Sequence, residues 1–208
     1  MALDLEEQEQ LDEFKAWWKK NGKLLTNLVL AALIAYSAWL AYNWFQQKKA
    51  TEASELYQSL VQLDAAKIAD IKTQSSKLME NYSGTPYAGR AAVFAAKNNY
   101  AANDSKSAKA QLEWAISNAK ESPVRAIAGL QLASILLEEK KYDEALKVLS
   151  AESDKGYEGL KQGLQGDIYL AQGKPAEAKK AYESALGNLD ATGRLHRYTM
   201  QKLESLGS

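Results

Sequence analysis

The most distinctive hydrophobic pattern in the chain is an uncharged segment from Leu24 to Gln47, bounded by Lys23 and Lys48. A helix rises about 1.5 Å per residue, so this segment would reach about 36 Å, enough to cross a hydrocarbon layer of roughly 30 Å with some tilt. Aromatic residues gather near its end, where their rings favour the headgroup region of a bilayer. These are Trp39, Tyr42, Trp44 and Phe45. The pattern predicts a transmembrane helix over residues 24–47.

Two other interpretations of this segment fit less well. A cleavable signal peptide has a shorter apolar core and a small-residue cleavage site, whereas here bulky aromatics lead directly into Gln46 and Lys48. A buried helix of a soluble protein rarely stays uncharged over this length. We therefore expect a retained signal anchor.

Lysines beside the span favour one orientation. Four precede it and two follow it, namely Lys15, Lys19, Lys20 and Lys23 before, and Lys48 and Lys49 after. Lysines near the ends of a span are enriched on the cytoplasmic side. We expect residues 1–23 to be cytoplasmic and residues 48–208 to lie across the membrane. The absence of cysteine is compatible with this orientation but does not distinguish compartments.

The regions in and before the span offer two candidate contact surfaces. Ala31, Ala35 and Ala38 lie along one helical face, and small residues permit close packing against another membrane helix. The preceding segment carries apolar residues, including Phe14 and Trp17, ahead of a lysine pair. It is expected to lie along the membrane interface, or alternatively to contact a cytoplasmic regulator.

Residues 48–208 show helical rather than strand periodicity. Runs such as AIAGLQLASILLEE place apolar residues at spacings of three and four, and few alternating β-branched stretches occur. Pro86, Pro123 and Pro175 each stand where a helix would start, a position that tolerates a missing amide proton. The pattern predicts one all-α domain.

An internal repeat organises this domain. The segment YDEALKVL from Tyr142 matches PAEAKKAYESAL from Pro175, with Ala145 over Ala178 at an offset of 33 residues. That offset is close to the roughly 34 residues of tetratricopeptide repeats, which the later copy resembles. The matching positions of that copy are Gly166, Tyr169, Ala178, Tyr182 and Ala185.

Two weaker copies precede it, over 122–156 and 85–121, and flanking helices at roughly 49–82 and 191–206 would cap the stack. The expected fold is therefore all-α: a single N-terminal transmembrane helix followed by a tetratricopeptide-like α-solenoid of about three helix pairs with capping helices.

Composition argues against several function classes. The chain has no cysteine and one histidine, His196, without a nucleophile motif beside it, and its glycines form no phosphate-binding loop. With 26 basic and 26 acidic residues and no basic stripe after the span, nothing indicates nucleic acid. We expect no enzyme activity, no cofactor and no metal site.

The expected activity is binding, on the surface formed by the first helix of each pair. By resemblance to tetratricopeptide repeats, the groove positions are Arg90, Val93, Lys97, Tyr100, Ile127, Leu130, Ser134, Leu137, Leu160, Asp167 and Leu170. An apolar groove would suit unfolded or extended polypeptide, because apolar burial is non-directional. Alternatively, its leucines are ordinary core between helices.

The chain as a whole resembles the YfgM family of bacterial inner-membrane proteins. The resemblance is carried by FKAWWKKNGK, from Phe14 to Lys23, joined to the span, and by GTPYAGRAA, from Gly84 to Ala92. It implies an ancillary subunit of the SecYEG translocon with a periplasmic domain. It also implies association with a PpiD-like periplasmic chaperone and assistance to nascent secreted proteins.

Three alternatives remain. The chain could be an envelope scaffold that does not touch unfolded clients. It could be a negative regulator of a stress-response pathway that acts through its cytoplasmic residues 1–23. The least favoured alternative, an enzyme, would require a turnover that depends on His196.

Overall fold

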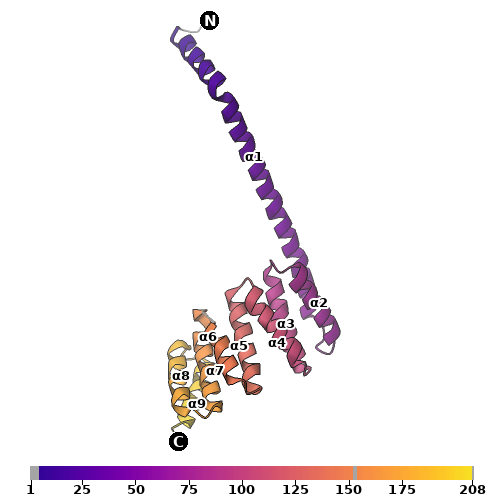
Figure 1. Cartoon of the computed structure of the whole chain (residues 1–208), viewed down its shortest axis with the longest axis vertical. Helices are drawn as coiled ribbons and strands as arrows, with labels where there is room; N and C mark the ends of the chain where they lie inside the picture. Colours follow the sequence, from indigo (N-terminus) through magenta and orange to yellow (C-terminus); the bar gives the residue numbers. More distant parts are fainter. Residues whose placement is uncertain (1–4, 152–153, 208) are drawn as a thin grey trace. The chain divides into compact units, whose positions relative to one another are not determined.

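The computed structural model describes residues 5–151 and 154–207, and every regular element in these ranges is helical (Figure 1). The all-α prediction is confirmed. The elements are α1 (Leu5–Val61), α2 (Ile68–Asn81), α3 (Pro86–Ala101), α4 (Ser105–Asn118), α5 (Ser122–Glu138), α6 (Tyr142–Ala151), the short 3₁₀ helix η1 (Lys155–Tyr157), α7 (Glu158–Ala171), α8 (Pro175–Asn188) and α9 (Arg194–Ser205).

The chain divides into two units, Met1–Lys49 and Ala50–Ser208. The described part of the first unit belongs to α1, whose most apolar 18-residue window has a mean hydropathy of 1.8 and no buried residue. This helix is long and apolar enough to cross a membrane. Lys48 Nζ lies 5.6 Å from the ring centroid of Trp44, and Lys49 Nζ lies 5.0 Å from that of Phe45. Each lysine thus lies over the aromatic ring four residues before it at the end of the apolar segment, and both residue types favour a membrane interface.

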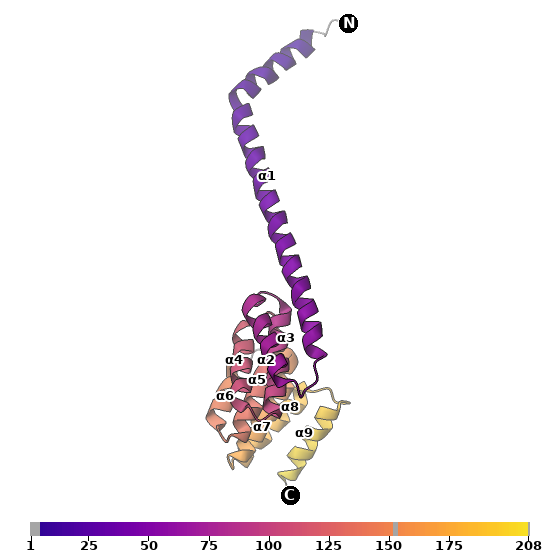
Figure 2. The same ribbon diagram turned by 90° about the vertical axis from the view of Figure 1, so that its right-hand side faces the viewer.

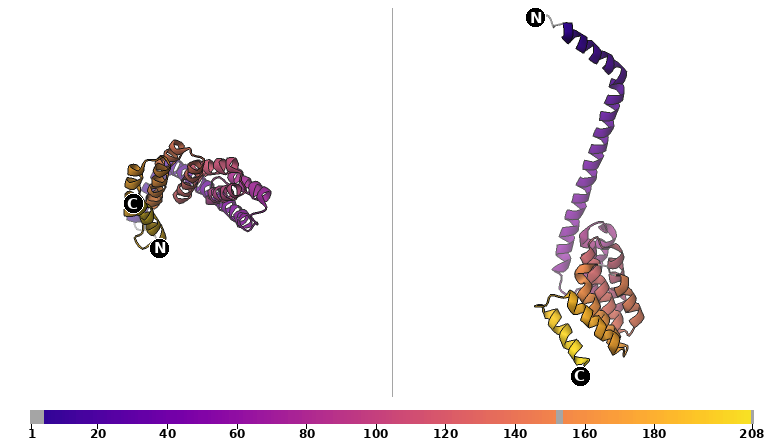
Figure 3. Two further views of the ribbon diagram at one scale, coloured as in Figure 1. Left: turned by 90° about the horizontal axis from the view of Figure 1, so that it is seen from below. Right: turned by 90° about the vertical axis from the view of Figure 1, so that its left-hand side faces the viewer.

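The second unit is a stack of helix pairs, seen in chain order from purple to yellow in Figures 2 and 3. The pairs are α3 with α4, α5 with α6, and α7 with α8, and α9 follows. The three predicted pairs are therefore present. The flanking segment 49–82, expected as one helix, instead forms a further pair from the end of α1 and α2. The chain turns between them, where the Asp64 carboxylate accepts a hydrogen bond from the Ala66 amide at 2.8 Å.

Small side chains let paired helices approach closely. Ala145 and Ala178, the matched residues of the repeat, are fully buried, as are Tyr182 and Ala185. The position of Gly166 directly faces the Tyr182 ring, so a Cβ there would collide with it. The residues that identify the repeat are therefore packing residues, which explains their spacing.

The turns inside the α3–α4, α5–α6 and α7–α8 pairs share one backbone conformation. Asn103, Lys140 and Gly173 adopt positive φ angles of 62°, 61° and 74°. In each turn the residue after this one donates its amide to the carbonyl five positions earlier, for example Lys174 to Tyr169 at 2.9 Å. Such a bond satisfies a carbonyl group of the last helical turn when the residue just after the helix is left-handed.

Ionic contacts join neighbouring pairs. Glu139, which follows α5, accepts hydrogen bonds from Lys109 at 2.6 Å, from Lys141 at 2.8 Å and from Ser105 at 2.8 Å. The bond from Lys109 is the largest cause of the lowered pKa of Glu139, which falls to about 2. This carboxylate ties α4 to the start of the α5–α6 turn.

Candidate binding groove

Three adjoining pockets form a groove on the face made by the first helix of each pair. The Tyr57 pocket has a volume of about 290 Å³ and lies between the end of α1, α3 and α5. The Tyr100 pocket, also about 290 Å³, lies further along α3 and α5. The Leu160 pocket, about 230 Å³, lies between α5, α7 and α9. We call the surface formed by these pockets the inner groove.

Shared residues make the inner groove continuous. Lys97 and Gln131 line both the Tyr57 and the Tyr100 pockets. Leu130 and Ser134 line both the Tyr100 and the Leu160 pockets. A ligand that fills one pocket is therefore beside the next.

Nine of the eleven groove residues predicted from the repeat line these pockets. They are Arg90, Val93, Lys97, Tyr100, Ile127, Leu130, Ser134, Leu160 and Asp167. The other two do not. Leu137 is half-buried against the hydrophobic core, as the alternative of ordinary core packing expects. Leu170 is 42% exposed and lies outside the three pockets.

The structure also brings in residues that the repeat pattern missed. Tyr57 comes from the end of α1, and Leu195, Tyr198 and Lys202 come from α9. Both segments were expected only to cap the stack. For the end of α1, one sequence signal was available: the helical spacing of Leu56, Tyr57 and Leu60, which indicates a helix that lines the groove.

In the α3–α5 part of the groove, charges at the two ends are paired. Arg90 binds the Glu121 carboxylate through two bonds of 2.7 and 2.6 Å, and this hydrogen bonding is the main cause of the lowered pKa of Glu121. At the other end the Tyr100 hydroxyl donates to Glu138 at 2.5 Å, which raises the pKa of Tyr100. The side chain of Lys97, between them, makes no ion pair or hydrogen bond with any residue that the structure describes.

In the α7–α9 part of the groove, the charged side chains bind other residues of the same chain. Asp167 accepts a hydrogen bond from the Tyr182 hydroxyl at 2.7 Å and is bound by Lys202 Nζ at 2.6 and 2.8 Å. Burial is the main cause of the raised pKa of Tyr182, and the bond to Asp167 adds to it. Asp167 is thus the point where α7, α8 and α9 meet.

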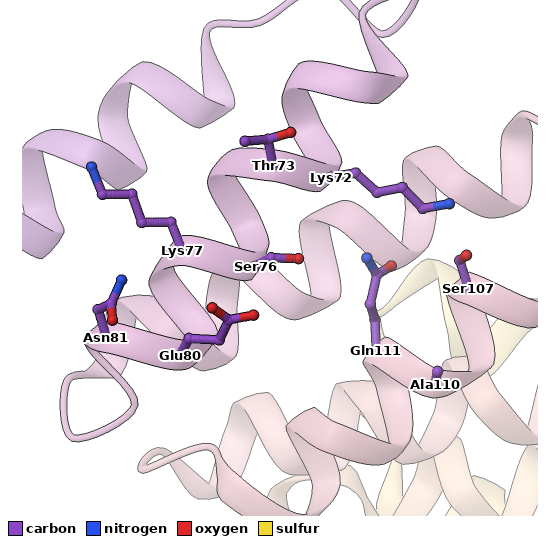
Figure 4. A pocket seen from close by; sticks show the side chains of 9 residues that line it. All are labelled: Lys72, Thr73, Ser76, Lys77, Glu80, Asn81, Ser107, Ala110 and Gln111. Atoms are coloured by element: carbon purple, nitrogen blue, oxygen red, sulfur yellow. The ribbon is translucent and has the colours of Figure 1, made fainter.

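The pocket between α2 and α4 has a different lining. It has a volume of about 650 Å³, and Figure 4 shows lysine, hydroxyl and amide side chains around it. Lys72 pairs with Asp104 at 2.7 Å, and the Gln111 carbonyl accepts a bond from Asn99 at 2.8 Å. This pocket exposes more polar surface than any of the three pockets of the inner groove.

The remaining chemical candidates do not assemble into a site. His196 is half-buried on α9. Among residues 5–151 and 154–207, no group of three or more His, Asp or Glu side chains could hold a metal ion.

Comparisons with known proteins agree with this architecture. Residues 15–208 match the sequence model of the family described as tetratricopeptide repeat-like domain. The chain is 34% identical to an ancillary SecYEG translocon subunit of Neisseria gonorrhoeae, over 99% of this chain and 100% of the relative. A protein with the same description from Escherichia coli is 26% identical over 99% of both chains. One from Haemophilus influenzae is 28% identical over 89% of this chain and 91% of the relative.

Proposed function

Because this chain belongs to the YfgM family of ancillary SecYEG translocon subunits, with its tetratricopeptide repeat-like domain, we propose that it assists newly secreted proteins beside the translocon. In this proposal residues 24–47 anchor the chain in the inner membrane. Residues 1–23 are cytoplasmic, and residues 48–208 form a periplasmic domain that works with a PpiD-like chaperone.

The continuity of the inner groove is the observation that carries this proposal. Three apolar pockets share lining residues, so a segment of unfolded chain can occupy them in succession. Filling such a pocket with one large apolar side chain contributes about 1.5–3 kcal/mol before the cost of ordering the chain. Binding energies of this size per pocket suit the transient binding of many different clients.

Photo-crosslinking in living bacteria tests the partners. A probe would replace Ala35 in the span, Ile127 in the groove, or Lys147 on the exposed surface of α6 as the control. We expect translocon adducts from Ala35 and nascent secreted protein or chaperone adducts from Ile127, with neither from Lys147. Adducts of Ile127 limited to envelope assembly proteins would instead favour the scaffold alternative.

Orientation can be tested directly because the chain has no cysteine. Glu9→Cys and Ser117→Cys place single thiols at exposed positions in the two units. In spheroplasts, a membrane-impermeant maleimide should label Ser117→Cys alone, and Glu9→Cys should react only after lysis. The reverse pattern would contradict the periplasmic placement of residues 48–208.

A further inference from the structure

Lys97 is an exposed cation in the middle of the inner groove. Three other lysines of the domain bind carboxylates: Lys72 binds Asp104, Lys109 binds Glu139, and Lys202 binds Asp167. Lys97 has none in the described part of the chain, and the amide of Gln131 beside it has no side-chain hydrogen bond there either. A cation and an amide donor are therefore available to a ligand at one place in the groove.

Apolar surface lies on both sides of this polar point. On one side the Tyr57 pocket presents Val93, Phe94 and Ile127. On the other side the Tyr100 pocket presents Leu130 and other apolar side chains of α4 and α5. Since Lys97 and Gln131 line both pockets, a ligand that contacts them can reach apolar surface in both directions.

The spacing matches an extended peptide. Val93 and Lys97 are four residues apart on α3, so their positions differ by about 6 Å along the helix. Residues i and i+2 of an extended chain point the same way and are about 6.6 Å apart. One turn of α3 thus corresponds to every second residue of a bound strand. The matching pattern is apolar, any residue, acidic, any residue, apolar.

Charge at the ends of the α3–α5 part limits the ligand to one acidic group. Arg90 is already neutralised by Glu121, so it offers little to a second carboxylate. At the other end Glu138 presents a carboxylate of its own, bonded to Tyr100, which would repel another acid. Only the position opposite Lys97 favours a negative charge.

We propose that the α3–α5 part of the inner groove selects extended polypeptide segments in which one internal acidic side chain lies between two large apolar side chains. Lys97 binds the carboxylate, and the Tyr57 and Tyr100 pockets each take one apolar side chain. An internal acid is specified because a chain-terminal carboxylate at Lys97 would leave one of the two pockets empty. This inference rests on the proposed function, since it names the client segments of the same groove.

Fluorescence anisotropy with the full chain in lipid nanodiscs tests the selection. Three labelled peptides share a Gly-Ser frame around Leu-Ser-Asp-Ser-Leu, Leu-Ser-Asn-Ser-Leu or Leu-Ser-Lys-Ser-Leu, and a fourth has serine in place of both leucines. At low salt the Asp peptide should bind about two- to fivefold more tightly than the Asn peptide, the range for an exposed ion pair, and about tenfold more tightly than the Lys peptide.

Substitutions at Lys97 locate the effect. Lys97→Gln should abolish the preference for the Asp peptide, and Lys97→Glu should reverse the order so that the Lys peptide binds best. Lys77→Gln is the matched control, because Lys77 is an exposed lysine beside the α2–α4 pocket, away from the groove (Figure 4). Its preference should equal that of the unmodified chain.

The outcomes separate the two proposals. If the leucine peptides bind equally whatever their central residue, or if Lys77→Gln alters the preference as much as Lys97→Gln does, the acidic selection is overturned while client binding stands. If no leucine peptide binds more tightly than the serine peptide, client binding by the groove itself is overturned.

Discussion

Two parts of the inner groove use matched positions for different purposes. Lys97 and Asp167 stand at equivalent places on the first helices, because successive copies are offset by 37 and 33 residues, with Ser134 between them. Lys97 is open to a ligand, whereas Asp167 is occupied by Tyr182 and Lys202 of the same chain. The same repeat position can thus serve recognition in one copy and internal cohesion in another.

The second helices explain this difference. The residues at the matched position there are Leu112, Leu149 and Tyr182, all buried. Only the tyrosine has a hydroxyl that reaches across to a groove residue, Asp167. In the last pair, α8 is therefore bonded to the groove residue Asp167 of α7. Lys202 of α9 binds the same carboxylate.

Removing the Tyr182 side chain should have the largest effect on this contrast. Tyr182→Ala leaves a cavity beneath Asp167 and should lower the free energy of unfolding by about 3–5 kcal/mol, the range for large aromatic residues in a core. Denaturant unfolding of the full chain in detergent, followed by circular dichroism, measures this. Tyr198→Ala is the control, since Tyr198 is 56% exposed, and it should cost less than about 1 kcal/mol. Equal losses would contradict the tie.

A smaller loss of stability is expected when a methyl group is added beside the Tyr182 ring. Gly166→Ala places a methyl group against the Tyr182 ring, which is buried and cannot move away, so unfolding should become easier by about 1–3 kcal/mol. Gly187→Ala is the matched control, because Gly187 is also helical but has open space around it. There the exchange should be neutral or stabilising by up to about 1 kcal/mol. Thermal unfolding of both variants compares the two glycines.

Loosening α9 should have a local effect. Lys202→Gln removes the ion pair with Asp167 but keeps the Tyr182 bond, so the domain should stay folded while amide hydrogen exchange in α9 accelerates by up to about fivefold. Mass spectrometry of the exchanged chain reads this by segment. Lys179→Gln, at an exposed position of α8, should leave α9 unchanged. Faster exchange throughout the domain would show that Lys202 stabilises more than α9.

The weakest expected effect is a pH dependence of stability at the α4–α5 contact, which belongs to the half of the groove that contains Lys97. The folded pKa of Glu139 is about 2, below its ordinary value near 4.5, so its contribution to stability is present above about pH 4.5 and is lost as the pH falls toward 2. Glu139→Gln should cost less than about 1 kcal/mol at pH 6, and this difference from the unmodified chain should vanish near pH 2.

Unfolding curves at several pH values measure that difference. Glu183→Gln, at an exposed position of α8, is the comparison and should show no such convergence. If the cost of Glu139→Gln stayed constant down to pH 2, the Lys109 and Lys141 contacts would not be stabilising the ionised carboxylate.

The sequence predicted which residues of the first helices share one face, because local rules determine that face. Helical periodicity and the repeat offset place Val93, Leu130 and Leu160 on the same face of successive first helices, and packing of pairs fixes that face. The proline positions likewise predicted the starts of α3, α5 and α8. These features depend on contacts within a repeat.

What could not be predicted depends on contacts between elements that share no repeat pattern. The bond from Lys202 to Asp167 joins residues 35 apart, and no spacing rule connects α9 to α7. The turn at Asp64 divides the first flanking segment without any glycine or proline to mark it. Whether Lys97 finds a partner also depends on the side chains of neighbouring pairs, which only the folded structure brings together.

The left-handed turns have a consequence for the order of folding. A residue with a Cβ carries a penalty in this conformation, roughly 1–2 kcal/mol for lysine and less for asparagine, so the turns at Lys140 and Asn103 close less readily than the turn at Gly173. Since a repeat array can nucleate at any pair and grow by adding neighbours, we expect α7 and α8 to form first. The domain would then fold from its carboxy-terminal pair toward α3, and the section that holds Lys97 would be among the last to become structured.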